Sequence, residues 1–166
     1  MAVADFRDRL LAGLGGPWPE AGPLNAKVVE STQADGFRRE LVSYEVEPGE
    51  RVESYLLVPD GVTATKPAPA VCLWHQHNGA WSLGMSEPAG LAGMPMHHTG
   101  VALAREGYVV LCPDALGFGR REQGYKVKGG NLERYLFLKY VVAGKCLAWK
   151  HILDMRRAVD YLSSRA

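Results

Sequence analysis

Two histidines one residue apart, His75 and His77, lie in the loop HQHNG at residues 75–79, directly after an apolar run. In an extended chain, residues two apart point the same way, so both imidazoles could bind one metal ion. A zinc site needs at least one further ligand, which His97 or His98 could supply. A metal-dependent enzyme is therefore one hypothesis, although neighbouring histidines on a helix would point roughly 100° apart.

The same loop could act through its backbone instead. An enzyme of acyl transfer must stabilise the negative charge that develops on a carbonyl oxygen, and fixed backbone N–H groups do this well. A third interpretation is that His75 and His77 only fill space at the end of a strand. The residue types of the loop leave all three interpretations open.

A second loop that could carry chemistry, residues 114–120, follows another apolar run. Asp114 stands at the end of that run, and an acid at the end of a parallel strand is well placed for catalysis. The alternative is that Asp114 orders the loop that follows it. Gly117 and Gly119 begin a G-x-G-x-x-G pattern, but Glu122 occupies the place of the third glycine, so nucleotide binding is not predicted. We expect no cofactor and, if the loop acts through its backbone, no metal.

The elements that must position these loops follow from the spacing of apolar residues. The runs at 70–74 and 108–112 are continuous, which is typical of strands covered on both faces. An alternating pattern predicts a hairpin at a sheet edge, with Pro48 and Gly49 in its turn. The predicted elements in chain order are a helix over 3–14, hairpin strands over 41–47 and 52–58, a strand over 70–74, a helix over 96–106, a strand over 108–112, a helix capped by Asn131, and a helix over 145–163.

The succession of strand, helix and strand, with both strands buried, indicates a parallel sheet in an α/β fold. The expected sheet is mostly parallel, with the antiparallel hairpin at its edge. We expect one domain over residues 1–166, of which residues 1–25 form an N-terminal helix and an irregular lead-in. The domain is expected to be incomplete, because the apolar stripe of the helix at 145–163 needs a sheet to cover and no strand follows it.

Composition narrows the range of partners and compartments. Of the 166 residues, 47% are apolar and 22% are charged, as in an ordinary globular protein. The net charge of +1 gives no electrostatic reason to expect nucleic acid or an anionic membrane as partner. No apolar run reaches the roughly 20 residues of a membrane span, and charges near the N-terminus argue against a signal peptide. Three cysteines without CxxC spacing favour a reducing compartment, so we expect a cytoplasmic protein.

Two blocks of sequence carry a family resemblance: PAVCLWHQHNG at 69–79 and ALAREGYVVLCPDALGFGR at 102–120. They resemble the α/β-hydrolase superfamily, and within it the group of dienelactone hydrolases and acetyl xylan esterases. The resemblance runs from about residue 37 to the end and corresponds to the N-terminal half of that fold. It implies that the backbone N–H of His77 donates to an oxyanion and that Gln76 belongs to the same catalytic loop. On the substrate side we expect His75 and Asn78 of this loop, together with Trp81, whose side chain could line an apolar pocket near it.

The chain departs from that family in one important respect. The family places its nucleophile on a G-x-S-x-G elbow, followed by an acid and a histidine. The nearest match, GMSEP at 84–88, lacks the second glycine, and no histidine lies late enough to complete the triad. We therefore expect an esterase truncated before its nucleophile, inactive alone, which acts on a small ester when a C-terminal half completes it. The alternatives are a non-catalytic assembly or ligand-binding module, as a homo-oligomer or with a complementing chain, and the metal-dependent enzyme using His75 and His77.

Overall fold

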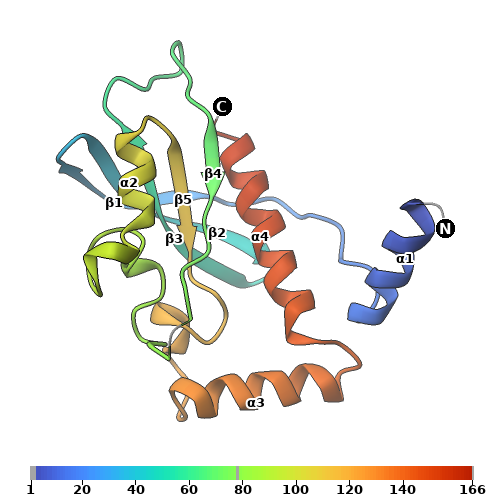
Figure 1. Ribbon diagram of the computed structural model, residues 1–166. Helices are drawn as coiled ribbons and strands as arrows, with labels where there is room; N and C mark the ends of the chain where they lie inside the picture. Colours follow the sequence, from blue (N-terminus) through green and yellow to red (C-terminus); the bar gives the residue numbers. More distant parts are fainter. Residues whose placement is uncertain (1–2, 78, 166) are drawn as a thin grey trace.

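The computed structural model describes residues 3–77 and 79–165, and Figure 1 labels its main helices and strands. Within these residues, no helix is both long and apolar enough to cross a membrane. The elements in chain order are α1 (Val3–Leu14), β1 (Lys27–Ala34), β2 (Phe37–Glu47), β3 (Glu50–Pro59), β4 (Ala70–Cys72), the 3-10 turns η1 (Gly84–Ser86) and η2 (Pro95–His97), α2 (Thr99–Arg105), β5 (Val109–Pro113), the 3-10 turn η3 (Gly119–Glu122), α3 (Gly129–Val142) and α4 (Leu147–Ser163).

The five strands form one sheet in the order β1-β2-β3-β5-β4. The two apolar runs pair in parallel, with Ala70 opposite Val109 and Cys72 opposite Leu111. Only β5 is buried as predicted; β4 covers three residues at the edge of the sheet, and none of them is buried. The three other pairings are antiparallel, so within the described residues the sheet is mostly antiparallel rather than mostly parallel as expected. Short turns connect β1, β2 and β3 and force antiparallel neighbours, whereas a parallel pair needs a crossover such as the one through α2. The predicted α/β class is confirmed.

The hairpin of β2 and β3 is longer than predicted and does not lie at the edge of the sheet. Its turn is the predicted one, and Gly49 takes the positive φ of 78° that a glycine allows. The edge is occupied by β1, which the apolar pattern does not predict. All but the last residue of β1 are exposed, including Val28 and Val29, so this strand has no buried face to leave a pattern in the sequence.

Helices α2 and α4 cover opposite faces of the sheet (Figure 1). Leu56 and Val58 of β3 belong to the core cluster that contains Ala158 and Tyr161 of α4. Leu57, between them in the strand, belongs instead to the cluster that contains residues of α2. Because successive strand residues point to opposite faces, the two helices enclose the sheet in three layers.

Helix α3 lies beyond the end of the sheet at which β5 terminates (Figure 1). Its buried residues Leu132 and Leu136 pack against Leu116 and Leu147, which joins the helix to the loop after β5 and to the start of α4. The prediction that Asn131 caps this helix is wrong, because α3 begins two residues earlier, at Gly129. The other predicted helices are confirmed over most of their length, as α1, α2 and α4.

A buried network of charges fixes α4 to the hairpin turn and to the loop after β5. The fully buried Lys150 ammonium lies 2.5 Å from Glu47, 2.9 Å from Glu50 and 3.0 Å from Asp154. Arg121 joins the same two elements, at 2.6 Å from Asp154 and 2.5 Å from Glu50. A buried charge needs such partners, so the loop that carries Arg121 has a defined position relative to α4.

Candidate functional site

Three segments meet beyond the ends of the parallel strands: the histidine loop after β4, the loop after β5, and the first turns of α3. The backbone N–H of Gly119 donates to the carbonyl oxygen of Trp81 at 2.8 Å. The indole N–H of Trp81 in turn donates to Glu133 of α3 at 3.0 Å. This is the end of the sheet at which open α/β folds bind their ligands.

His75 joins the two strand-end loops to each other. The N–H of Ala115 donates to its Nε2 at 3.1 Å, so the ring proton lies on Nδ1, which donates to the carbonyl oxygen of Gln76 at 3.0 Å. Burial, which outweighs the hydrogen bond to Gln76, lowers the pKa of the His75 imidazole below its usual value. His75 is therefore a neutral histidine with both ring nitrogens engaged, and its ring packs 4.8 Å from that of Phe118.

Gln76 is held by a cluster that the sequence does not predict. Its side-chain amide donates to the buried carboxylate of Glu87 at 3.0 Å and lies in contact with His97. Glu87 also interacts with His97 Nδ1 at 3.1 Å and accepts from the backbone N–H of Met94 at 3.2 Å. Burial acts to raise the pKa of the Glu87 carboxyl, but these hydrogen bonds outweigh it and hold the pKa below its usual value.

His77 is held from the other side, by α3. Its Nδ1 accepts the N–H of Gly79 at 3.2 Å, so the ring proton lies on Nε2, which donates to Glu133 at 3.0 Å. Glu133 therefore accepts from both His77 and Trp81. Burial acts to raise the pKa of the Glu133 carboxyl, but the bonds from Trp81 and His77 outweigh it and lower the pKa. The start of α3 can approach the Trp81 ring closely because residue 130 is a glycine, whose added Cβ would lie 3.2 Å from the ring.

The backbone of the histidine loop contains free donors. Among residues 3–77 and 79–165, nothing accepts a hydrogen bond from the N–H of Gln76 or His77. Most N–H groups of folded chains are paired unless they face solvent or a ligand. Asn78, which we expect on the substrate side, lies outside the described residues.

Asp114 orders the loops around it, which is the second of the two interpretations that the sequence leaves open. Its two carboxylate oxygens accept the backbone N–H groups of Met85 at 2.6 Å and Arg120 at 2.8 Å. Burial, which outweighs those hydrogen bonds, raises the pKa of Asp114 to about 6. A Cβ at Gly84 or Gly119 would lie 2.1 Å or 2.5 Å from the carboxylate, so glycine is required at both positions. Because both of its oxygens are engaged, Asp114 acts as a clamp between the segment at 84–85 and the loop after β5.

The histidines do not converge on one point. His75 bonds to the loop after β5, His77 to α3, His97 to Glu87, and His98 to the carbonyl oxygen of Ala92. In the described part of the chain, no group of three or more His, Cys, Asp or Glu side chains is arranged to hold a metal ion. The geometry thus gives no support to the hypothesis of a metal centre on His75 and His77.

The sequence and the structure are similar to those of known proteins. No protein-family model matches the sequence. The chain is 27% identical over 161 residues to "Putative hydrolase YtaP" of Bacillus subtilis strain 168, a match that covers 96% of this chain and 51% of that protein. The structure superposes on that of a "putative acetyl xylan esterase" from Bacteroides fragilis, with a TM-score of 0.76 and 16% identity, over 97% of this chain and 42% of the other. A glucuronoyl esterase from Solibacter usitatus gives a TM-score of 0.48 and 17% identity, over 95% and 47%.

The superposition with the Bacteroides fragilis protein shows that the fold is α/β-hydrolase-like. The chain spans about half the length of the curated relative that it matches. The fold agrees with the resemblance seen in the sequence.

Proposed function

We propose that this chain contributes the oxyanion-stabilising part of a carboxylic-ester hydrolase. The observation that carries the proposal is the N–H of His77, which has no acceptor among residues 3–77 and 79–165, in a loop that is held from both sides at the end of the parallel strands. Gln76 is bonded to Glu87 on one side, and His77 is bonded to Glu133 on the other. A donor fixed in this way needs no reorganisation when negative charge develops on a substrate oxygen, which is what catalysis by electrostatic stabilisation requires.

In the proposed reaction, the ester carbonyl oxygen accepts the N–H of His77 as a nucleophile adds to the carbonyl carbon. Gln76 positions the loop through Glu87, and His75 keeps the loop against Ala115. Trp81 and the ring face of His75 supply apolar walls for the substrate, and Asn78 is the third residue that we propose for substrate binding. The substrate is then a small ester, and the nucleophile, its base and its acid come from residues outside 1–166, because the sequence contains no G-x-S-x-G.

We also propose a domain organisation and a location for this chain. The 166 residues form one domain, with residues 1–25 as a lead-in to it, and correspond to the N-terminal half of the hydrolase fold, so the chain is inactive alone. The match to the Bacillus subtilis protein covers 51% of that protein, which supports the assignment to part of a hydrolase fold. The three free thiols, Cys72, Cys112 and Cys146, support a cytoplasmic location.

The first test is an assay for hydrolysis of p-nitrophenyl acetate by the 166-residue chain and by a polypeptide read on from the same gene past codon 166. We expect turnover only from the longer polypeptide, and only if the added sequence contains G-x-S-x-G followed by an acid and a histidine. Turnover by residues 1–166 that persists through purification would contradict the proposal, as would a downstream sequence without a nucleophile elbow.

The second test removes the donor itself. In the active longer polypeptide, His77→Pro deletes the backbone N–H, whereas His77→Ala keeps it and deletes only the side chain. We expect His77→Pro to lower kcat by about 10²–10³ and His77→Ala to lower it much less. Circular dichroism and the urea midpoint of both variants show whether the fold is intact. Equal loss in the two variants would assign the effect to the imidazole and not to the N–H.

A second candidate function is a non-catalytic assembly module, and one observation favours it. Helix α3 exposes a row of large apolar side chains, of which Val142 is 88% exposed, and Phe137 and Leu138 are about half exposed. Such side chains are frequent at protein–protein contacts. Sedimentation equilibrium of the 166-residue chain separates the candidates: a stable homo-oligomer supports the assembly module, and a monomer at micromolar concentration argues against it.

A further inference from the structure

A pocket at the opposite end of the sheet is not used by the proposed chemistry. It has a volume of about 290 Å³ and lies between β3, the loop at 62–68 and the end of α4. Ala70 and Val109, the first residues of β4 and β5, line it, whereas the histidine loop follows the last residue of β4. The two sites are therefore separated by the length of the parallel strands.

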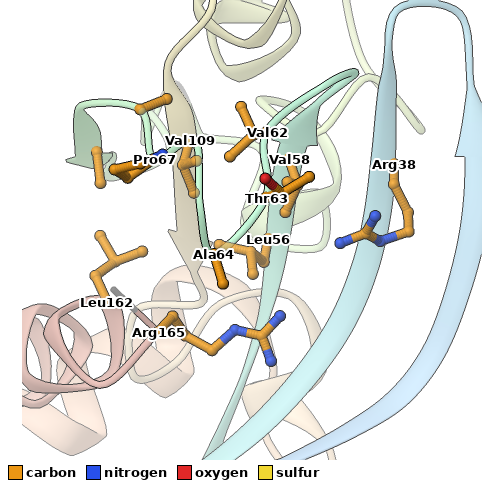
Figure 2. A pocket seen from close by; sticks show the side chains of 12 residues that line it. Arg38, Leu56, Val58, Val62, Thr63, Ala64, Pro67, Val109, Leu162 and Arg165 are labelled. Atoms are coloured by element: carbon orange, nitrogen blue, oxygen red, sulfur yellow. The ribbon is translucent and has the colours of Figure 1, made fainter.

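The pocket combines an apolar wall with two cationic groups. Leu56, Val58 and Leu162 supply apolar surface. Figure 2 shows the guanidinium groups of Arg38 and Arg165 turned toward each other beside that surface. They come from β2 and from the end of α4, so the fold and not local sequence brings them together.

The two arginines share one carboxylate. Glu40, which is only 5% exposed, lies 2.8 Å from Arg38 Nε through Oε1 and 3.2 Å from Arg165 Nη2 through Oε2. Within the described residues, both Nη atoms of Arg38 and the Nε and Nη1 atoms of Arg165 have no hydrogen-bond partner. One negative charge thus faces two positive ones, which leaves a net positive charge and several oriented donors beside the apolar wall.

We propose that this pocket binds a small organic anion, with a carboxylate on Arg38 and Arg165 and an apolar body against Leu56, Val58 and Leu162. Guanidinium groups bind carboxylates by paired charge-assisted hydrogen bonds. A volume of about 290 Å³ is at the small end of the range for ligand sites, which suits an acid of several carbons rather than a large ligand. The proposal does not rest on the hydrolase assignment.

The test is isothermal titration calorimetry of the 166-residue chain with octanoate, octanol and acetate. We expect saturable binding of octanoate, binding of octanol weaker by about tenfold because it lacks the charge, and no measurable binding of acetate because it lacks the apolar body. Equal affinity for octanoate and octanol would overturn the proposal, and so would the absence of octanoate binding.

Variants locate the site. The double substitution Arg38→Gln and Arg165→Gln should weaken octanoate binding by at least about tenfold. Ala64→Phe, on the exposed loop that lines the pocket, should block octanoate binding. Arg105→Gln is the matched control, since Arg105 is an exposed arginine that pairs with Asp35 and does not line the pocket.

Glu40→Gln removes the carboxylate that competes for the two arginines and should tighten octanoate binding. Unchanged affinity in the double variant or in Ala64→Phe would place octanoate elsewhere and overturn the proposal.

Discussion

At the scale of single residues, the site is organised by carboxylates that accept hydrogen bonds from main-chain and side-chain donors. Asp114 accepts two backbone N–H groups, Glu87 holds Gln76, and Glu133 holds His77 and Trp81. None of the three carries out chemistry on a substrate in the proposed reaction. Each instead fixes the position of a loop, and a backbone donor that stabilises an oxyanion must be fixed in this way.

Replacing Asp114 with Asn tests its role as a clamp. Asn keeps one acceptor oxygen but turns its NH₂ group toward the second backbone donor, so we expect the free energy of unfolding to fall by about 1–3 kcal/mol. The folded pKa of about 6 is above the ordinary value of 3.8, so the contribution of Asp114 to stability is largest below pH 3.8 and declines as pH rises through 6. Urea unfolding at pH 4 and pH 7 should therefore show that Asp114→Asn lowers the free energy of unfolding, relative to the parent chain, by more at pH 4 than at pH 7. A deficit that grows with pH would contradict the sign of the shift.

Replacing Glu133 with Ala tests the connection between the histidine loop and α3. The change removes the acceptor of the His77 and Trp81 hydrogen bonds, so the loop should open more often. We expect the amide of Gly79, which donates to His77, to exchange with deuterium about tenfold faster. Lys139→Ala on the same helix is the control, because within the described residues Lys139 forms no ion pair. Equal exchange in both variants would show that α3 does not hold the loop.

At the scale of elements, the position of α3 depends on few contacts. Leu136 is fully buried against the loop after β5 and the start of α4, whereas Leu138, two residues later, is 53% exposed. We expect Leu136→Ala to lower the free energy of unfolding by about 2–5 kcal/mol, as core truncations do. Leu138→Ala should change it by no more than about 0.5 kcal/mol. Similar losses in urea unfolding of the two variants would mean that the face of α3 around Leu138 is buried in solution, for example in an oligomer.

Most elements with a buried face are ones that the sequence predicts, and α1 is predicted although none of its described side chains is buried. The run at 108–112 is continuous because helices cover both sides of β5. The run at 70–74 also predicts its strand, β4, although β4 lies at the edge of the sheet and has no buried residue. The edge strand β1 has no buried face and therefore no periodic pattern. The site is predicted to the same extent: the histidine loop follows from its strand, but its partners do not. Glu133 lies 56 residues from His77, and no local pattern reports where α3 will place it.

At the scale of the whole molecule, two partly buried histidines near Trp74 make stability depend on pH. The rings of His75 and His151 both lie about 6 Å from that of Trp74. Burial lowers the pKa of His75 despite its bond to Gln76, and it lowers the pKa of His151 despite the nearby Asp154 carboxylate. His151 Nε2 is buried without a hydrogen-bond partner in the described residues. Both imidazoles are thus neutral in the folded protein and would have to take up protons in acid.

The sign of that dependence follows from linkage. Below the ordinary pKa of 6.5 the unfolded chain binds more protons at these two histidines than the folded chain does, so their contribution is present above pH 6.5 and is lost as pH falls through the lowered folded values. We expect the contribution of these two histidines to the urea midpoint to fall between pH 6.5 and 5, while the contribution of Asp114 rises as the pH falls. His151→Phe keeps a ring beside Trp74 but cannot titrate, so it should flatten the fall, whereas Arg105→Gln should leave it unchanged. A slope in His151→Phe as steep as in the parent chain would show that the neutral His151 ring contributes nothing to stability.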